Sequence, residues 1–331
     1  MADLLNTAQD AVTRDYDLLR DDCGLIELET LGLVALYGDD RKGWLQGQVP
    51  NDIKELTPGT FASFCLCEST GHLRSVLDAW ALSDRFLMAC PRETLPAVLE
   101  RVQKMVVLED VRAEDLTSKY RLFSIQGPNA TRNLSQFLEL PKLDAGEVAV
   151  GKASVFVTRS DRTGSGGWDV WIPASARSTI AKIADAWPKI GREAFEIARL
   201  EAGIPAWGSD MNSRTLPPEM GPAFEARYVS YSKGCYTGQE VLMRMHSRGH
   251  TNRTWMALLS EDPLEAGASV AHVRREDAGV VTSAALSPDY GYIGAAMLRN
   301  EAAFQGETVK VRTERGESEA EVRQMPLLRL D

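Results

Sequence analysis

The sequence lacks any uninterrupted apolar stretch of roughly 18 residues, the length that a helix needs to cross a bilayer. Its first 20 residues also lack the pattern of a secretory signal, because Asp10, Arg14, Asp15 and Asp17 interrupt the apolar residues there. We therefore predict that the protein has no membrane partner and that it is cytoplasmic.

Basic residues are in the minority. The chain has 37 Lys and Arg residues against 47 Asp and Glu residues, so its formal net charge is −10. A negative charge argues against general nucleic-acid binding, which depends on positively charged surfaces. We therefore do not expect nucleic acid to be a partner.

Cysteine and histidine are scarce, with five and four residues among 331. An odd number of cysteines without a sign of secretion predicts reduced thiols. Cys65 and Cys67 stand two residues apart in an apolar run, so we expect both on one buried face of a strand. His246 and His250 would share a helix face, but Gly249 and the strand-like residues after it argue against a helix there. The sequence therefore predicts no metal site.

Local periodicities predict an α+β protein. Gly32–Tyr37, Phe61–Cys67 and Ala153–Thr158 have the composition of strands. The apolar residues of Arg92–Val107 and Ala174–Trp187 recur at the spacing of a helix.

A weak internal repeat runs through the first two thirds of the chain. Leu33–Gly38 is an apolar run that ends at a glycine and is followed, seven residues later, by a leucine. Leu122–Gly127 repeats this arrangement 89 residues further on (127 − 38). We predict two related ferredoxin-like β-α-β-β-α-β units, at about residues 30–110 and 118–190. Chance similarity of two strand–turn–helix segments is the alternative.

From about residue 243 onward, short apolar strands alternate with turns. Such segments recur roughly every ten residues, with Gly and Pro between them, which is typical of a small antiparallel β-barrel. We therefore predict a first region at 1–242 and a C-terminal barrel at 243–331. The strand-like segments are Trp255–Leu259, Ala268–His272, Gly279–Thr282, Tyr292–Met297, Thr308–Arg312 and Glu319–Arg323.

The segment KGCYTGQE, residues 233–240, differs from the rest of the chain. Gly234 and Gly238 flank Cys235, and glycine allows backbone conformations that keep a loop thiol within reach of another molecule. Five basic residues lie between positions 227 and 253, against a single acid, Glu240. Positive neighbours favour the thiolate, the reactive form of cysteine. Cys235 is therefore a candidate reactive thiol with Lys233 beside it; the alternative is an inert cysteine in a packed loop between domains.

The same segment, together with RMHSRG at 244–249, resembles the signature of YgfZ-type proteins. Residues 199–208 resemble the RLEAG-x-P-x-[YW]-G segment of the wider glycine-cleavage T-protein superfamily. Residues 44–52 resemble its FLQG-x-[VL]-[TS]-ND element, and residues 126–128 resemble its QGP turn. The resemblance covers about residues 23–255. It implies a ring of domains around a central folate channel, with a C-terminal barrel as a cap.

The resemblance also implies a cofactor, tetrahydrofolate or a derivative, and residues that would bind it. Asp169 falls where the family pattern G-[FV]-E places a carboxylate for the pterin, with Asp in place of Glu. Arg199 falls on the Arg of the RLEAG match, and a guanidinium suits the dianionic glutamate tail of folate. Trp207 is a candidate to stack on a ring of the ligand. The structural alternatives are a solvated strand residue, a helix-surface Arg and a core Trp.

One departure from the family pattern concerns catalysis. The family's G-x-x-x-D-D-L-x-V-Y stretch matches residues 71–80, where Ser75 and Val76 replace the two aspartates. Valine has no proton to exchange, whereas a general acid–base needs a titratable group within hydrogen-bond reach. Asp78 follows on the same strand face about 7 Å further along, as a displaced substitute. We therefore favour binding over catalysis and leave enzyme activity uncertain, leaning toward none.

Taken with the motifs, the resemblance implies a tetrahydrofolate-binding accessory protein for iron–sulfur cluster assembly or repair, with Cys235 as the reactive group. Its partners would be iron–sulfur client or assembly proteins. A single cysteine does not hold a cluster in the usual four-thiolate manner, so sulfur acceptance, transient bridging and redox chemistry all stay open. One alternative function is a folate-dependent aminomethyltransferase or demethylase. Another is an interaction module without folate, whose basic stretch at 244–253 would dock an acidic partner or RNA.

Overall fold

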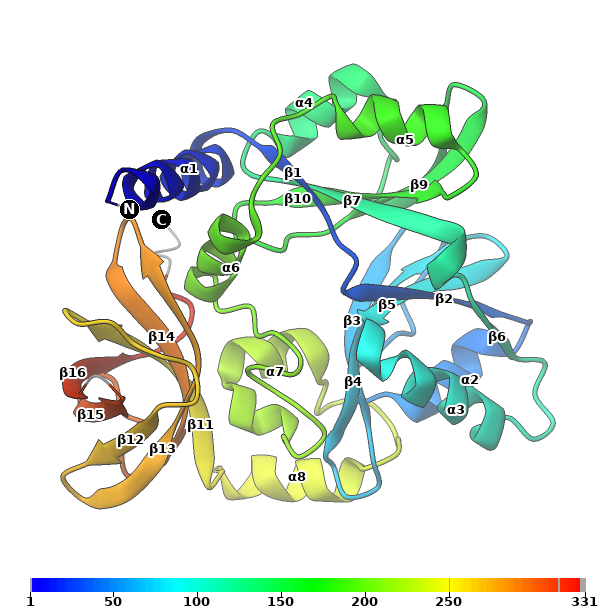
Figure 1. Cartoon of the computed structure of the whole chain (residues 1–331). Helices are drawn as coiled ribbons and strands as arrows, with labels where there is room; N and C mark the ends of the chain where they lie inside the picture. The colour runs from blue at the N-terminus through cyan, green and yellow to red at the C-terminus, as the bar shows by residue number, and fades with distance from the viewer. Residues whose placement is uncertain (1, 250, 315, 328–331) are drawn as a thin grey trace.

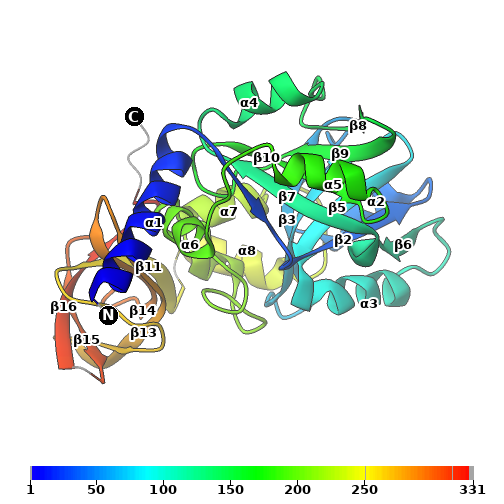
Figure 2. The same ribbon diagram turned by 45° about the horizontal axis from the view of Figure 1, so that its top comes forward.

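The computed structural model describes residues 2–249, 251–314 and 316–327. They form two α+β units and a β-barrel, arranged with connecting helices as a ring (Figure 1). The barrel lies on one side of the ring and the two α+β units on the other. In the turned view, the N-terminal helix α1 (Ala2–Asp21) crosses from the barrel toward the second unit (Figure 2).

The first α+β unit is an antiparallel sheet with the strand order β3-β4-β5-β2-β6. Side chains of β2 alternate between its two faces, as a strand requires. Val34 and Leu36 pack beneath α2 and α3, whereas Leu33 and Ala35 face the sheet of the second unit. The elements are β2 (Leu31–Tyr37), α2 (Arg41–Gln48), β3 (Phe61–Cys67), β4 (Leu73–Ala81), β5 (Arg85–Pro91), η1 (Arg92–Thr94), α3 (Leu95–Met105) and β6 (Arg112–Asp115).

The second unit has the equivalent order β8-β9-β10-β7-β1. Its closing strand therefore comes from the N-terminal side of the first unit, outside the predicted range of 118–190. Each sheet also has one more strand than a ferredoxin-like unit, namely β3 in the first sheet and β8 in the second. The elements are β1 (Gly24–Glu27), η2 (Thr117–Lys119), β7 (Tyr120–Gln126), α4 (Ala130–Phe137), β8 (Ala145–Val150), β9 (Ala153–Arg159), β10 (Gly167–Pro173) and α5 (Arg177–Ala184).

The glycines that end β2 and β7 make the same close approach in both units. Gly38 and Gly127 have φ values of 104° and 126°, which favour glycine. A Cβ on Gly38 would lie 1.9 Å from the carbonyl oxygen of Asp110, and one on Gly127 would lie 2.4 Å from that of Asp22. Asp110 precedes β6 and Asp22 precedes β1. This shared geometry supports the predicted relationship between the units. It also shows that β1 has the same position in the second sheet as β6 has in the first.

Four helical elements lie between the second unit and the barrel: α6 (Arg192–Glu201), η3 (Pro217–Met220), α7 (Pro222–Tyr228) and α8 (Gln239–Arg248). The expectation of no helix at His246 was wrong, because α8 continues to Arg248 and ends at Gly249 in the left-handed conformation with φ 71°. His246 stacks on Tyr231 with 3.7 Å between the ring centroids. His250 lies outside the described residues.

The C-terminal barrel is closed, with the strand order β11-β14-β13-β12-β15-β16. The α+β fold with an antiparallel barrel that the sequence predicts is thereby confirmed. A division at 242/243 stays a prediction, since α8 runs through that position and β11 begins at Arg253. The strands are β11 (Arg253–Ser260), β12 (Ser269–His272), β13 (Arg275–Ser287), β14 (Gly291–Arg299), β15 (Thr308–Thr313) and β16 (Gly316–Arg323).

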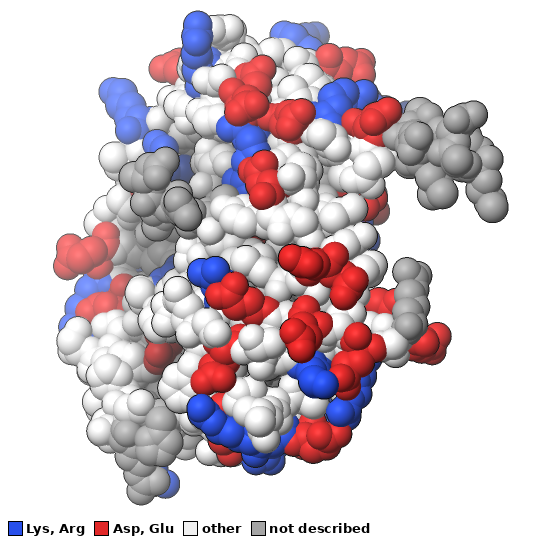
Figure 3. All heavy atoms as spheres, turned by 90° about the vertical axis from the view of Figure 1, so that its left-hand side faces the viewer, with Lys and Arg blue, Asp and Glu red and all other residues white. Residues whose placement is uncertain are grey.

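The surface around the barrel carries charges of both signs. Figure 3 shows acidic and basic side chains interspersed over this face, and its described residues form no continuous basic area. On the barrel itself, Lys310 pairs with Glu317 at 2.6 Å. Across the described ranges, no helix has both the length and the apolar character needed to span a membrane.

Candidate functional site

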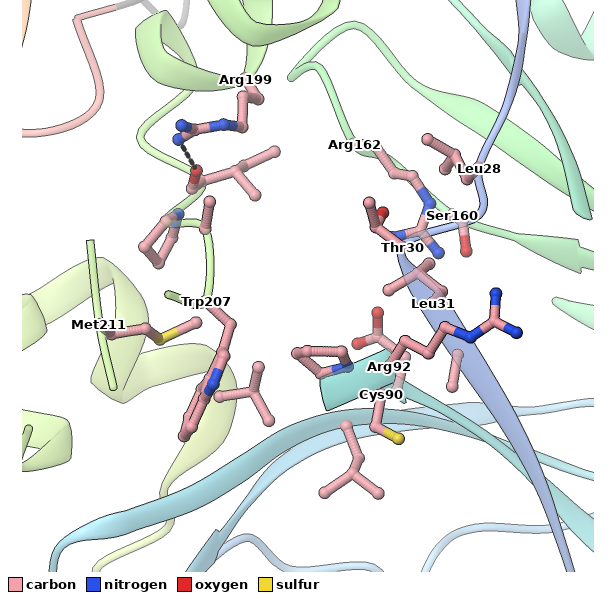
Figure 4. A pocket seen from close by; sticks show the side chains of 18 of the residues that line it. Leu28, Thr30, Leu31, Cys90, Arg92, Ser160, Arg162, Arg199, Trp207 and Met211 are labelled. Carbon is pink, nitrogen blue, oxygen red and sulfur yellow. Dashed lines mark hydrogen bonds between the residues drawn. The ribbon is translucent and has the colours of Figure 1, made fainter. Parts of the chain in front are cut away.

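A pocket of about 450 Å³ lies where the two α+β units meet α6 and the loop at 203–211 (Figure 4). Ligand pockets of small molecules commonly have volumes of about 300–1,000 Å³. Arg199, Trp207 and Met211 lie on one side of this pocket, and Arg162, Ser160 and Arg92 lie on the other (Figure 4).

Asp78 places a carboxylate on the wall of this pocket. It stands on β4 two residues after Val76, and both residues line the pocket, as the alternation of a strand predicts. Ser63 Oγ donates to Asp78 Oδ1 at 2.5 Å, and Arg227 Nη2 donates to the same oxygen at 3.1 Å. Within the described residues both bonds end on Oδ1, which leaves Oδ2 open to a ligand.

The charge on Asp78 is stabilised by its neighbours. Burial acts to raise the pKa of this carboxyl, but Arg227, Arg162 and the hydrogen bond from Ser63 together hold it below its usual value. Tyr228 and Asp78 in turn raise the pKa of Arg227. At neutral pH the pocket therefore contains an ionised acceptor, which suits the amino and N–H groups of a pterin.

Asp169 lies behind the pocket wall rather than on it. Its side chain is fully buried on β10, and Ser124 Oγ donates to its Oδ1 at 2.7 Å. Arg162 Nη2 donates to its Oδ2 at 2.5 Å, and Arg162 Nε lies 3.2 Å from both oxygens. Arg162 is therefore the group through which Asp169 reaches the pocket.

Arg199 lines the pocket, and most of its donors are already engaged. Nη1 donates to Asp210 Oδ2 at 2.9 Å and to the carbonyl oxygen of Ile204 at 3.1 Å. Nε donates to Glu196 Oε2 at 2.6 Å, and Nη2 donates to Ser283 Oγ on β13 at 3.2 Å. Arg199 thus ties α6 to the loop at 203–211 and to the barrel, with one edge facing the pocket.

Aromatic and polar groups complete the lining. Trp207 is half-buried on the pocket wall and Tyr228 is a second aromatic neighbour. Ser160 Oγ is buried and, across the residues described, has no hydrogen-bond partner. An unpartnered buried hydroxyl is costly unless a ligand or water satisfies it, so Ser160 is a further candidate ligand contact.

A second hollow of about 500 Å³ adjoins the pocket. It shares Asp78, Ser160, Asp161 and Arg227 with the first. The two hollows meet at these four residues.

Cys235 lies away from the pocket, on the segment 229–238, which we call the thiol loop. All five cysteines are free; Cys235 is exposed and the other four, including Cys65 and Cys67, are buried. Gly238 has a φ of 88°, and a Cβ there would lie 2.5 Å from the carbonyl oxygen of Glu68. At Gly234 a Cβ would meet nothing within 4 Å. Gly238 therefore requires glycine, whereas Gly234 does not.

Lys233 is buried although it neighbours the exposed thiol. Its Nζ donates to the carbonyl oxygens of Gln46 and Val49, each at 2.6 Å, and of Asn51 at 3.0 Å. Burial lowers its pKa to about 8, with Asp52 opposing the shift and Lys54 adding to it. Two of the other basic residues near the loop also have partners elsewhere: Arg227 bonds to Asp78, and Arg253 to Glu219.

The structure thus brings three of the predicted site residues, Asp78, Arg199 and Trp207, to one pocket. Asp169 adjoins it through Arg162, while Cys235 and Lys233 lie outside its lining, on the thiol loop. Sequence reasoning missed Arg162 and Ser160, which follow β9 in a stretch without a motif. No group of three or more His, Cys, Asp or Glu side chains in the described ranges is placed to hold a metal ion.

Comparison with known proteins assigns this architecture to a protein family. The model of the GCVT N-terminal domain matches residues 4–228, and that of the glycine cleavage T-protein C-terminal barrel domain matches residues 253–328. The chain belongs to the glycine-cleavage T-protein family. The two matches leave residues 229–252 between them, and this interval contains the thiol loop and α8.

Individual T-protein relatives carry two different names. An aminomethyltransferase of Rubrobacter xylanophilus is 29% identical over 290 residues, covering 85% of this chain and 77% of that one. A tRNA-modifying protein YgfZ of Colwellia psychrerythraea is 25% identical over 285 residues, covering 80% and 86%. The crystal structure of the glycine cleavage system aminomethyltransferase T of Bartonella henselae has a TM-score of 0.86 at 22% identity, covering 96% and 89%, and shows the shared fold. Tetrahydrofolate is compatible with membership of this family.

Proposed function

We propose that this T-protein family member binds a reduced folate in the pocket at Asp78 and acts as a YgfZ-type accessory protein in iron–sulfur cluster assembly or repair. Cys235 is its reactive group. The observation that carries the proposal is the position of this thiol: it is the exposed one of five cysteines, on a loop held by buried side chains on either side.

The pocket has the groups that a reduced folate needs. Asp78 Oδ2 accepts hydrogen bonds from the pterin, and Ser160 Oγ offers a further buried contact. Trp207 provides an aromatic surface. Arg199 keeps an edge toward the pocket for the carboxylates of the tail, and Arg162 supplies a second positive charge there. Asp169 contributes by holding Arg162 in place.

The replacement of the family's paired acids supports binding over turnover. Ser75 is buried outside the pocket lining, and its Oγ lies 2.7 Å from Thr94 Oγ1. Val76 faces the pocket but has no proton to transfer. The thiol then supplies the chemistry as a single nucleophile. It takes sulfane sulfur from a persulfide and releases the donor's thiol, replaces another ligand on a cluster iron transiently, or exchanges with a disulfide, one sulfur of which leaves as a thiol.

The test is Cys235→Ala, compared with the neighbouring control Ser232→Ala. Calorimetry under anaerobic conditions should give the same tetrahydrofolate affinity for both variants and the wild type, because Cys235 lies outside the pocket. In cells that lack the gene, iron–sulfur enzyme activity should be restored by Ser232→Ala and not by Cys235→Ala. Full restoration of iron–sulfur enzyme activity by Cys235→Ala would contradict the proposal. If the wild type does not bind folate, the proposal also fails, and an interaction module without folate becomes the favoured function.

An aminomethyltransferase or folate-dependent demethylase is the second candidate function, because Asp78 lies in the pocket as an ionised group with a free oxygen. This candidate predicts that the wild type forms methylene-tetrahydrofolate from an aminomethyl or methylamine donor and that Asp78→Asn does not. We expect no product from the wild type under these conditions.

A further inference from the structure

The ammonium group of Lys233 is fully used inside the protein. A lysine side chain carries three N–H donors, and those of Lys233 bond to the carbonyl oxygens of Gln46, Val49 and Asn51. Gln46 belongs to the last turn of α2, where backbone carbonyls have no partner within the helix and a positive charge is favourable. Lys233 therefore has no donor left for a substrate.

The same lysine is one of two anchors of the thiol loop. Tyr236, three residues later, is buried against Cys65 and Cys67, and Lys233 Nζ lies 5.2 Å from the centroid of the Tyr236 ring. Gly234 and Cys235, between the anchors, are exposed. Since both flanking side chains point inward, they determine where the sulfur of Cys235 is presented.

The anchor also leads to the pocket. Asn51, whose carbonyl accepts from Lys233, donates through Nδ2 to the carbonyl oxygen of Ser63 at 2.6 Å and to that of Arg227 at 2.9 Å. Ser63 Oγ in turn donates to Asp78. A continuous set of hydrogen bonds thus joins the thiol loop to the carboxylate of the pocket.

From this geometry we infer that Lys233 is a positioning residue: it clamps the thiol loop to the end of α2 and thereby fixes Cys235 relative to the pocket. It does not take part in acid–base chemistry. The inference goes beyond the proposed function, because it concerns the presentation of the thiol whatever the thiol acts on.

Hydrogen exchange and alkylation test the clamp directly. Lys233→Met should speed amide exchange in two segments together, 230–237 and 46–51, because it removes the bonds between them. The rate of Cys235 alkylation by iodoacetamide at pH 7, below the pKa of about 8 of Lys233, should rise at least about fivefold because the loop is released. Intact-protein mass spectrometry reports this rate, since the other four thiols are buried.

The control is Lys54→Met, which removes a positive charge from the same neighbourhood while leaving the clamp intact. It should leave the exchange of both segments unchanged and should not speed alkylation at pH 7. If Lys233→Met leaves the alkylation rate at pH 7 unchanged or slows it, as loss of a positive charge would, or leaves exchange unchanged in either segment, the inference is overturned. If Lys233→Met does not fold, Lys233→Gln replaces it, because its side chain is shorter and carries no charge. The same results are expected for its amide exchange and its alkylation rate. Neither measurement involves folate or a cluster, so a failure of the proposed function leaves this test intact.

Discussion

Arg162 covers Asp169, so that the buried carboxylate on β10 meets the pocket only through a guanidinium. Arg162 Nη2 lies 2.5 Å from Asp169 Oδ2, and the side chain of Asp169 is fully buried. Burial acts to lower the pKa of Arg162, but the charge of Asp169 outweighs it and the pKa is raised. Arg162 lines the pocket and Asp169 lies behind it, so loss of the pair should disturb both the fold and the pocket.

Arg162→Met should destabilise the protein strongly. Removal of one partner leaves a buried charge without compensation, which costs about 3–5 kcal/mol. Urea unfolding of the wild type, Arg162→Met and the double variant Arg162→Met/Asp169→Asn measures the effect. The double variant should recover part of the loss, because its amide carries no charge. A loss below about 1 kcal/mol in the single variant, within the range of surface ion pairs, would show that the pair is not buried in solution.

The pair also shows how far sequence reasoning reaches into the site. Asp169 could be selected because it falls on a family pattern, and the position does adjoin the pocket. Arg162 stands seven residues earlier, in a loop whose course depends on how β9 and β10 are joined, and no local pattern reports that. Asp78 and Val76 were expected on one strand face, and the period of two placed both on the pocket wall.

The fold was predictable where local patterns decide it. Apolar and β-branched composition predicted β2, β3 and β9, and the Gly38–Gly127 offset predicted the repeat. The contribution of β1 to the second sheet was not predictable, because Gly24–Glu27 is a four-residue strand whose partner β7 lies about a hundred residues away in the sequence. Its pairing with β7 shows this role, and the close approach of Asp22 to Gly127, matching that of Asp110 to Gly38, shows the equivalence with β6.

Gly238→Ala should destabilise the thiol loop, whereas Gly234→Ala should be tolerated. At Gly238 a Cβ adds strain of about 1–3 kcal/mol from the positive φ and meets the carbonyl oxygen of Glu68 at 2.5 Å. At Gly234 the added methyl group meets open space. Thermal unfolding gives a matched comparison, because both variants carry the same Gly→Ala change at different positions of the loop. Equal melting temperatures would contradict the loop geometry.

One thiol in five should react rapidly in the native protein. Burial, followed by the charge of Asp22, raises the pKa of Cys23 to about 11, and burial raises that of Cys90 to about 12. Titration with an aromatic disulfide at neutral pH should therefore show one fast equivalent, lost in Cys235→Ala, and four more after unfolding. Two or more fast equivalents would mean that the core around Cys65 and Cys67 opens readily.

Asp78→Asn should weaken tetrahydrofolate binding at least about tenfold, since a charge-assisted hydrogen bond is worth about 1.5–3 kcal/mol. The substitution keeps the size of the side chain, so calorimetry with this variant isolates the loss of the charge. Unchanged affinity would remove Asp78 from the folate site.

Asp78→Asn also carries a pH signature. The folded pKa of Asp78 is lowered below 3.8, so its ionised form stabilises the fold above that value. The difference in unfolding free energy between wild type and variant should therefore shrink as the pH falls below about 4. Urea titrations at pH 3 and pH 6 compare the two proteins, and a constant difference would contradict the ion pair with Arg227.

Lys233 shifts stability with pH in the same direction as Asp78, but in an alkaline range. Its pKa is lowered by burial from 10.5 in an unperturbed lysine to about 8 in the folded protein. Between these values the unfolded chain binds more protons than the folded one, so stability rises with pH. Relative to Lys233→Met, the wild type should gain up to about 1.4 kcal/mol per pH unit above pH 8 and nothing below pH 7. Unfolding free energies at pH 7, 8.5 and 9.5 measure this gain, with Lys54→Met as the control that retains it. A stability difference that stays flat across this range would mean that the ammonium group is solvated, and the clamp on the thiol loop would lose its physical basis.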